Sequence, residues 1–127
     1  MTKTVVVLRH GQTDYNSQGR IQGRVDVPLN ETGRDQARRA AEDIAALGPT
    51  RIVSSPLTRA RDTAEALASL TGLSVEIDEG LAEKSFGDWE GLTWKEVRRR
   101  DPRGALTTRF LVAMGLVMHT LLRSAGV

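Results

Sequence analysis

The feature that most constrains the fold is an uninterrupted apolar run at residues 4–8, Thr-Val-Val-Val-Leu, in which most side chains are β-branched. Because the run lacks polar alternation, it predicts a strand that is buried on both faces, as in the interior of a parallel sheet. Parallel strands need a long crossover between them, usually a helix. A chain with such a strand is therefore expected to alternate strands with helices.

The rest of the sequence keeps that alternation. Further strands are predicted at 52–54, 74–77 and 109–113, and helices at about 32–47, 55–71, 93–100 and 116–124. Strands that alternate with helices pack as layers, and their crossovers are right-handed. The predicted fold class is α/β, a three-layer α/β/α sandwich with a mostly parallel sheet, in a single domain over residues 1–127.

Two helix starts are predicted from capping residues. Thr32 is expected to cap the first long helix, with an acidic residue three positions later. Ser55 is expected to cap the next, with Pro56 at the first helical position, where its missing N–H costs nothing, and Gly72 is expected to end it. The glycine-punctuated stretch 9–31 is expected to be irregular.

Composition excludes several classes of protein. The chain has no cysteine, which removes disulfides and thiolate chemistry, and no apolar stretch long enough to cross a membrane. A cytoplasmic location is expected, because no leader-like segment is present. Net charge is only +2, and the run Arg98-Arg99-Arg100 has no aromatic platform or binding motif beside it. It is therefore expected to be a solvated helix face and not a nucleic-acid site.

Polar side chains gather after several predicted strands. In open α/β sheets ligands bind at the carboxyl ends of the strands. The segments expected there are Arg9-His10-Gly11, Ser54-Ser55-Pro56 with Arg59 one turn later, and the loop from Glu83 to Gly87. Their shared position predicts one site.

His10 could be the nucleophile of that site. It directly follows the first predicted strand and precedes a glycine, which allows close approach of a ligand. A neutral imidazole can attack phosphorus and so split a difficult displacement into two easier steps. Arg9 and Arg59 could hold the phosphoryl oxygens. Taken singly, His10 could instead be a packed residue, and either Arg9 or Arg59 could be a surface arginine paired with Asp62 or Glu65.

Glu83 could be the proton donor. It lies near Phe86 and Trp89, and a carboxyl beside aromatic surface can have a raised pKa. Glu79 and Glu90 are rivals for this role, and Glu83 could also be a solvated loop residue.

Three stretches carry a resemblance to a known family. The segment 8–16, Leu-Arg-His-Gly-Gln-Thr-Asp-Tyr-Asn, with Arg-Ile-Gln-Gly at 20–23, resembles the signature of histidine phosphatases, which include cofactor-dependent phosphoglycerate mutases. The segment 54–64 is similar to the family's second arginine motif, and 81–92 to its acid-bearing loop. The resemblance covers residues 4 to about 97 in order and spacing.

The resemblance implies a phosphohistidine mechanism without metal or other cofactor. His10 would attack the phosphoryl group, and Arg9 and Arg59 would hold it. Glu83 would protonate the leaving oxygen and then activate water. The positions that match the phosphate pocket are Asn16, Gln22 and Gly23, together with the two arginines.

The expected function is phosphomonoester hydrolysis of a small phosphorylated metabolite. A phosphoglycerate mutase is one alternative. A catalytically impaired phosphate-binding or interaction protein is another, because the family carries a second histidine after its last strand, and Met114 stands at that place. His119, five residues later, is expected to point away. The segment between the acid loop and this strand is also short, so uncovered apolar surface could favour a homodimer.

Overall fold

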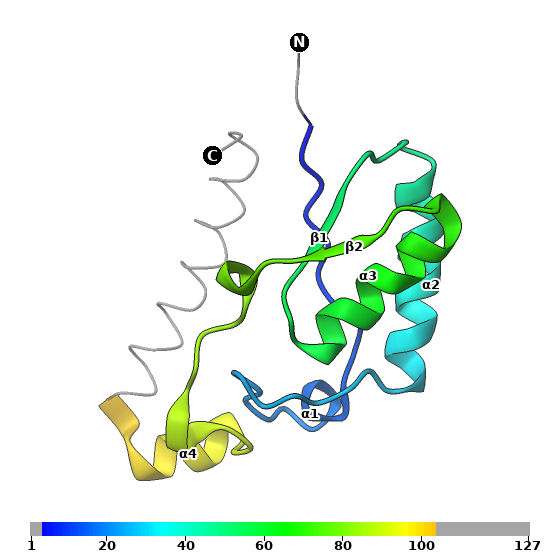
Figure 1. Cartoon of the computed structure of the whole chain (residues 1–127). Helices are drawn as coiled ribbons and strands as arrows, with labels where there is room; N and C mark the ends of the chain where they lie inside the picture. Colours follow the sequence, from blue (N-terminus) through cyan, green and yellow to red (C-terminus); the bar gives the residue numbers. More distant parts are fainter. Residues whose placement is uncertain (1–3, 104–127) are drawn as a thin grey trace. The chain divides into compact units, whose positions relative to one another are not determined.

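The computed structural model describes residues 4–103 (Figure 1). The chain divides into two compact units, which are described separately: unit 1 is Met1–Arg9 with Trp94–Val127, and unit 2 is His10–Thr93. The elements in chain order are α1 (Asp14–Ser17), α2 (Glu31–Ala45), β1 (Ile52–Ser54), α3 (Thr58–Thr71), β2 (Val75–Ile77), two 3-10 turns (Glu79–Leu81 and Gly87–Trp89) and α4 (Trp94–Arg100).

The sheet of unit 2 consists of β1 and β2, which run parallel. Ile52 pairs with Val75, and Ser54 pairs with Ile77. The Asp78 N–H continues this pairing by donating to the Ser54 carbonyl at 2.9 Å. Both strands lie where the sequence predicts them, and α3 is the helical crossover that a parallel pair needs.

The core of unit 2 forms where α3 packs on the sheet and on α2, which lies beside it (Figure 1). Small side chains on the facing surfaces of the two helices let them approach closely. The buried residues of this cluster are Ala41, Ile52, Ala64, Leu67 and Ala68.

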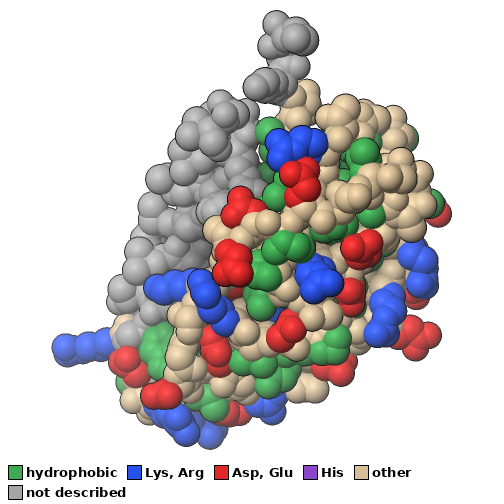
Figure 2. Space-filling view, viewed as in Figure 1, with side chains coloured by type: hydrophobic (Ala, Val, Ile, Leu, Met, Phe, Trp, Pro, Cys, Tyr) green, Lys and Arg blue, Asp and Glu red, His purple; other side chains and the backbone are tan. Residues whose placement is uncertain are grey.

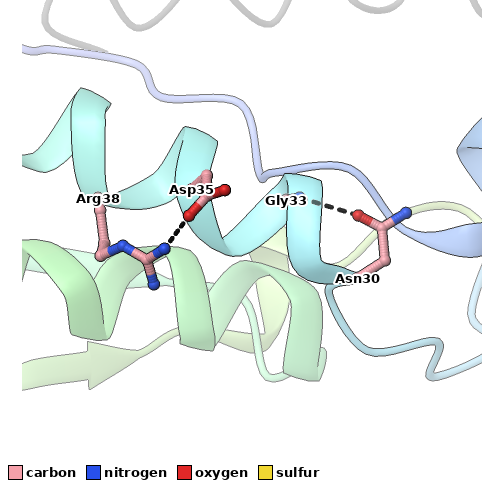
Figure 3. Close-up of polar contacts among 4 residues, drawn as sticks. All are labelled: Asn30, Gly33, Asp35 and Arg38. Atoms are coloured by element: carbon pink, nitrogen blue, oxygen red, sulfur yellow. Dashed lines mark hydrogen bonds and ion pairs between the residues drawn. The ribbon is translucent and has the colours of Figure 1, made fainter.

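Helix α2 begins at Glu31 because Asn30 caps it. Asn30 has extended backbone geometry, and its Oδ1 accepts from the Gly33 N–H at 2.8 Å (Figure 3). The prediction that Thr32 is the cap is therefore wrong, since Thr32 lies inside the helix. One turn further, Arg38 and Asp35 form an exposed ion pair (Figure 3), a kind of contact that adds only about 0.3–0.5 kcal/mol.

Helix α3 begins at Thr58, so the prediction of a start at Ser55-Pro56 is wrong. The residue before the helix, Leu57, offers no capping side chain. The cap comes from elsewhere in the chain, because the Asp26 carboxylate accepts from both the N–H and the hydroxyl of Thr58 at 2.7 Å. The helix ends as predicted at Gly72, whose φ is +74°.

In unit 1 the predicted strand at 4–8 is not formed. Its apolar side chains are substantially exposed, from 37% at Leu8 to 48% at Val6 and Val7. An apolar run indicates what a strand would bury, but a strand exists only when neighbouring strands pair with its backbone, and among residues 4–103 none pairs with this segment.

The rest of unit 1 that the structure describes is mainly α4, which matches the helix predicted at 93–100. Val97 is its buried residue, and Arg98, Arg99 and Arg100 are exposed as expected. The predicted strand 109–113, Met114, the predicted helix 116–124 and His119 lie outside the described residues. No helix within residues 4–103 has the length and hydropathy needed to cross a bilayer.

Candidate active site

His10 opens unit 2 in an irregular segment and is half-buried. Its Nδ1 lies 2.6 Å from the Gly11 carbonyl oxygen. A carbonyl can only accept, so Nδ1 carries the hydrogen, and in the neutral ring the lone pair is on Nε2. The backbone thus selects the tautomer in which Nε2 is the nucleophilic atom.

The segment after His10, residues 11–12, packs directly on the start of α2. A Cβ on Gly11 would overlap the carbonyl of Gly33, and a Cβ on Gly33 would overlap the backbone of Gln12. The two glycines are therefore needed for close approach of backbone to backbone. Asn30 completes this contact, because its N–H donates to the Gln12 carbonyl at 3.0 Å.

Thr63 on α3 connects this segment with the backbone of Arg59. Its hydroxyl accepts from the Gly11 N–H at 3.0 Å and donates to the Arg59 carbonyl at 2.7 Å. Thr63 is only 3% exposed. Sequence analysis did not single out Thr63, although it lies one helical turn after Arg59, a spacing that places both on the same face.

Arg59 is buried, with 2% of its surface exposed. Its Nη1 donates to the Val25 carbonyl at 2.8 Å and its Nη2 to the Gly23 carbonyl at 2.7 Å. Burial lowers the pKa of Arg59, and the negative charges of Glu83, Asp26 and Glu90 oppose that shift. A guanidinium stays charged in proteins, so a fixed cation stands at the start of α3.

Glu90 binds the loop that holds Arg59. Its Oε1 accepts from the N–H groups of Arg24 and Phe86, each at 3.0 Å, and from the Ser85 hydroxyl at 3.4 Å. The bond from the Arg24 N–H is the largest cause that lowers the pKa of Glu90. An ionised acceptor is poorly suited to deliver a proton, which argues against Glu90 as the acid.

Glu83 is exposed, and its Oε1 accepts from the Lys84 N–H at 2.9 Å. The Arg24 side chain donates from Nε to the Glu83 carbonyl at 3.1 Å, which ties the acid loop to residues 23–25. The negative charge of Glu83 also acts to raise the pKa of Arg59. The loop thus brings Glu83 into the electrostatic environment of Arg59, and its role as the acid stays a prediction.

Asn16 and Gln22 are both oriented by Thr13, which is fully buried. The Thr13 N–H donates to Asn16 Oδ1 at 2.9 Å, and its hydroxyl donates to Gln22 Oε1 at 2.6 Å. Because their oxygens are occupied, the NH₂ group is what each amide can offer to an anion. Thr13 also caps α1, a short helix that sequence analysis missed in the stretch expected to be irregular.

Arg9 is exposed and belongs to unit 1, so its part in the site stays a prediction.

Among residues 4–103 no group of three or more His, Asp or Glu side chains could hold a metal ion. On the face drawn in Figure 2, basic and acidic side chains are interspersed. A nucleic-acid site would need basic residues gathered in one area.

Comparison with known proteins gives the same picture over most of the chain. A family model, the histidine phosphatase superfamily (branch 1), matches residues 5–110. The glucosyl-3-phosphoglycerate phosphatase of Mycolicibacterium vanbaalenii is 48% identical over 107 residues, which are 84% of this chain and 48% of that protein. The chain thus spans about half the length of the curated relatives it matches.

Solved structures agree. A mycobacterial glucosyl-3-phosphoglycerate phosphatase in complex with VO3 has a TM-score of 0.75 and 48% identity, covering 77% of this chain and 47% of that one. A phosphoserine phosphatase from Entamoeba histolytica in complex with 3-phosphoglyceric acid has a TM-score of 0.65 and 40% identity, covering 70% and 44%. These neighbours have the phosphoglycerate mutase-like α/β fold, so the predicted fold class is confirmed. The chain belongs to branch 1 of the histidine phosphatase superfamily.

Proposed function

We propose that the protein hydrolyses phosphomonoesters of small metabolites through a phosphohistidine at His10. The observation that carries the proposal is the shared hydroxyl of Thr63, which accepts from the N–H of Gly11, next to His10, and donates to the backbone carbonyl of Arg59. A short path of hydrogen bonds therefore links the backbone next to the nucleophile with the backbone of Arg59, whose guanidinium would bind the phosphoryl group.

The first chemical step follows from the tautomer of His10. Nε2 attacks phosphorus, the bond from phosphorus to the ester oxygen breaks, and Glu83 gives its proton to that oxygen. Arg59, with Arg9, holds the other phosphoryl oxygens, where charge develops in the transition state. The amide groups of Asn16 and Gln22 supply further donors.

The second step reverses the roles. Water attacks the phosphorus of the phosphohistidine, the nitrogen–phosphorus bond breaks, and the Glu83 carboxylate takes the proton of the water. Inorganic phosphate leaves, and His10 and Glu83 return to their first states. Every step uses only side chains of this protein and water.

The substrate class is a small phosphorylated metabolite. The names of two relatives support it, since one is a glucosyl-3-phosphoglycerate phosphatase and another is a phosphoserine phosphatase in complex with 3-phosphoglyceric acid. Both names refer to compounds that carry a carboxylate as well as a phosphate. A cytoplasmic location and a homodimer stay predictions from the sequence.

The test is hydrolysis of a generic aryl phosphate by the wild type and by His10→Ala. Loss of the nucleophile should lower the rate by at least about 10³-fold, because the covalent route is removed. His119→Ala is the matched control, since the chain has only two histidines, and it should retain the wild-type rate. Equal rates for wild type and His10→Ala would contradict the proposal.

A second candidate is phosphate binding with little turnover. It is favoured by Met114, which stands where the family resemblance places a second histidine, because a thioether neither carries charge nor donates a hydrogen bond. In that case inorganic phosphate binds, and Arg59→Ala weakens the binding, but the aryl phosphate is not hydrolysed. A product phosphorylated at a new position would instead indicate a mutase.

A further inference from the structure

We infer that Glu90 is a positioning residue that sets the place of the Arg59 guanidinium by acting through the peptide group between Gly23 and Arg24. This inference rests on the proposed function for its effect on activity, but its geometry is independent of that function. Sequence analysis considered Glu90 only as a rival acid, and the structure assigns it a different part.

One peptide group lies between the two charged side chains. Its N–H belongs to Arg24 and donates to Glu90 Oε1 at 3.0 Å. Its carbonyl belongs to Gly23 and accepts from Arg59 Nη2 at 2.7 Å. The peptide therefore carries an anion on its donor side and a cation on its acceptor side. Each charge polarises the peptide in the sense that strengthens the other bond.

The backbone at Gly23 is shaped around this contact. Its φ is +53°, which disfavours any side chain, and a Cβ there would overlap the Glu90 carboxylate. Gly23 is also buried. The absence of a side chain lets the Glu90 oxygen reach the Arg24 N–H, so glycine and glutamate fit as a pair.

Glu90 also holds the acid loop. The oxygen that accepts from Arg24 accepts from the Phe86 N–H at 3.0 Å. A single carboxylate oxygen thus fixes both the loop that binds Arg59 and the loop that carries Glu83. The segments next to Gly23 and Glu90 in the chain are also joined by backbone hydrogen bonds, from the Ile21 N–H to the Leu92 carbonyl at 2.9 Å and from the Gly91 N–H to the Ile21 carbonyl at 2.8 Å. These two segments should therefore stay together when Glu90 is changed.

The first experiment measures the affinity for inorganic phosphate by calorimetry. Glu90→Ala removes the acceptor and should weaken binding about 10- to 100-fold, the effect of losing a hydrogen bond to a charged group. Glu90→Gln keeps an acceptor oxygen without the charge and should lose less than about tenfold. In the hydrolysis assay the Michaelis constant should rise by a factor similar to that of the dissociation constant, because Arg59 holds the phosphoryl group in the ground state as well.

Glu76→Ala is the matched control. Glu76 is also a glutamate of unit 2 whose carboxylate is hydrogen-bonded, in its case to Arg51 at 2.8 and 3.0 Å, and it lies on β2. Its loss should leave the phosphate affinity unchanged. An equal loss in Glu76→Ala and Glu90→Ala would mean that the effect is general, and would overturn the inference.

A double-mutant cycle tests whether Glu90 acts through Arg59. Once Arg59→Ala has removed the guanidinium, adding Glu90→Gln should change the phosphate affinity less than about twofold, since interacting residues are not additive. Fully additive losses would contradict the inference even if the protein is an active phosphatase.

A direct readout separates this inference from the proposed function. The guanidinium N–H resonances of Arg59 should be observable by NMR in the wild type, because two carbonyls hold the group. They should broaden or disappear in Glu90→Ala, shift in Glu90→Gln and stay unchanged in Glu76→Ala. Unchanged Arg59 signals in Glu90→Ala would overturn the inference whether or not the protein hydrolyses phosphate esters. Conversely, equal hydrolysis by wild type and His10→Ala would remove the proposed function and leave this result standing.

Discussion

The two halves of α3 bury different chemistry. In the N-terminal half the buried side chains are polar, Arg59 and Thr63, and both are hydrogen-bonded to backbone groups. From the middle of the helix to its C-terminal end they are apolar, Ala64, Leu67 and Ala68, and they belong to the core cluster. One helix thus carries a site at one end and a core at the other.

The two halves are expected to play different parts: the polar half positions site residues, and the apolar half stabilises the fold. Burying a charge or a hydroxyl is costly unless every polar atom finds a partner, and within residues 4–103 no buried side-chain nitrogen or oxygen lacks one. The polar half is therefore expected to contribute a fixed geometry and little net stability. The apolar half removes hydrocarbon from water and is expected to supply the stability that holds the polar half in place.

The largest effect is expected from the apolar half. Leu67 is 6% exposed, and Leu67→Ala should lower the free energy of unfolding by about 2–4 kcal/mol, because it leaves a cavity in the core. Hydrolysis per folded molecule should change little, since Leu67 belongs to the core cluster and its side chain takes no part in the hydrogen bonds of the site. Urea unfolding followed by circular dichroism measures the first quantity, and the aryl phosphate assay below the transition measures the second.

Leu70→Ala provides the comparison on the same helix. Leu70 is 54% exposed, so its truncation should cost about 0.5 kcal/mol or less. Should Leu67→Ala lower the rate per folded molecule as strongly as it lowers stability, the separation between the two halves would be lost.

The apolar half could be predicted from the sequence. Spacing of three and four residues predicts one buried face, made of Leu57, Ala60, Ala64, Leu67 and Ala68. The last three are buried and the first two are half-buried, and the predicted end of the helix at Gly72 is also correct. These features depend on neighbours along the chain, which a sequence displays. The motif resemblance in turn indicated His10 and Arg59 as site residues. The comparisons confirm that the chain belongs to the family.

What failed depends on partners that are distant in sequence. The cap of α3 is Asp26, which no local pattern connects with Thr58, and a local candidate, Ser55, was chosen instead. The strand at 4–8 had the right residues but no pairing partner within the described part of the chain. The contact of Glu90 with the Arg24 N–H likewise exists only after the chain has folded.

The next effect concerns the polar half. Thr63→Val keeps the shape of the side chain and removes its hydroxyl, so the buried Gly11 N–H loses its acceptor. The free energy of unfolding should fall by about 1–3 kcal/mol, the cost of an unsatisfied buried donor. The hydrolysis rate should fall as well, because the backbone next to His10 loses its bond to α3. Thr63→Ser restores an acceptor and should recover most of both.

Thr71→Val is the matched change in the other half. The Thr71 hydroxyl also donates to a carbonyl of its own helix, that of Leu67 at 3.1 Å, and it accepts from the Leu73 N–H at 3.3 Å. The free energy of unfolding of Thr71→Val should fall by at most about 1 kcal/mol, and its hydrolysis rate per folded molecule should stay unchanged. If the two valine variants lost the same share of activity, the polar half would have no special part in the site.

The smallest effect concerns the cap at the polar end, and it depends on pH. The hydrogen bond from the Thr58 hydroxyl is the largest cause that lowers the pKa of Asp26 in the folded protein. A carboxyl whose folded pKa lies below its unfolded value of about 3.9 stabilises the protein fully above that value. This contribution is lost as the pH falls through the folded pKa.

Asp26→Asn removes the charge and keeps one acceptor for the Thr58 N–H. At pH 7 the variant should be less stable than the wild type by about 0.5–1 kcal/mol, a small value because the carboxylate is exposed and screened. The difference should shrink as the pH falls below about 4 and disappear once the pH lies below the folded pKa of Asp26, since the protonated wild type then also lacks the charge. Asp62 is an exposed aspartate within α3 for which the structure gives no such capping bond. Asp62→Asn should therefore have the same stability as the wild type at each pH. Urea midpoints between pH 2 and pH 7 measure both curves, and a constant gap between Asp26→Asn and wild type across that range would show that the charge does not act as a helix cap.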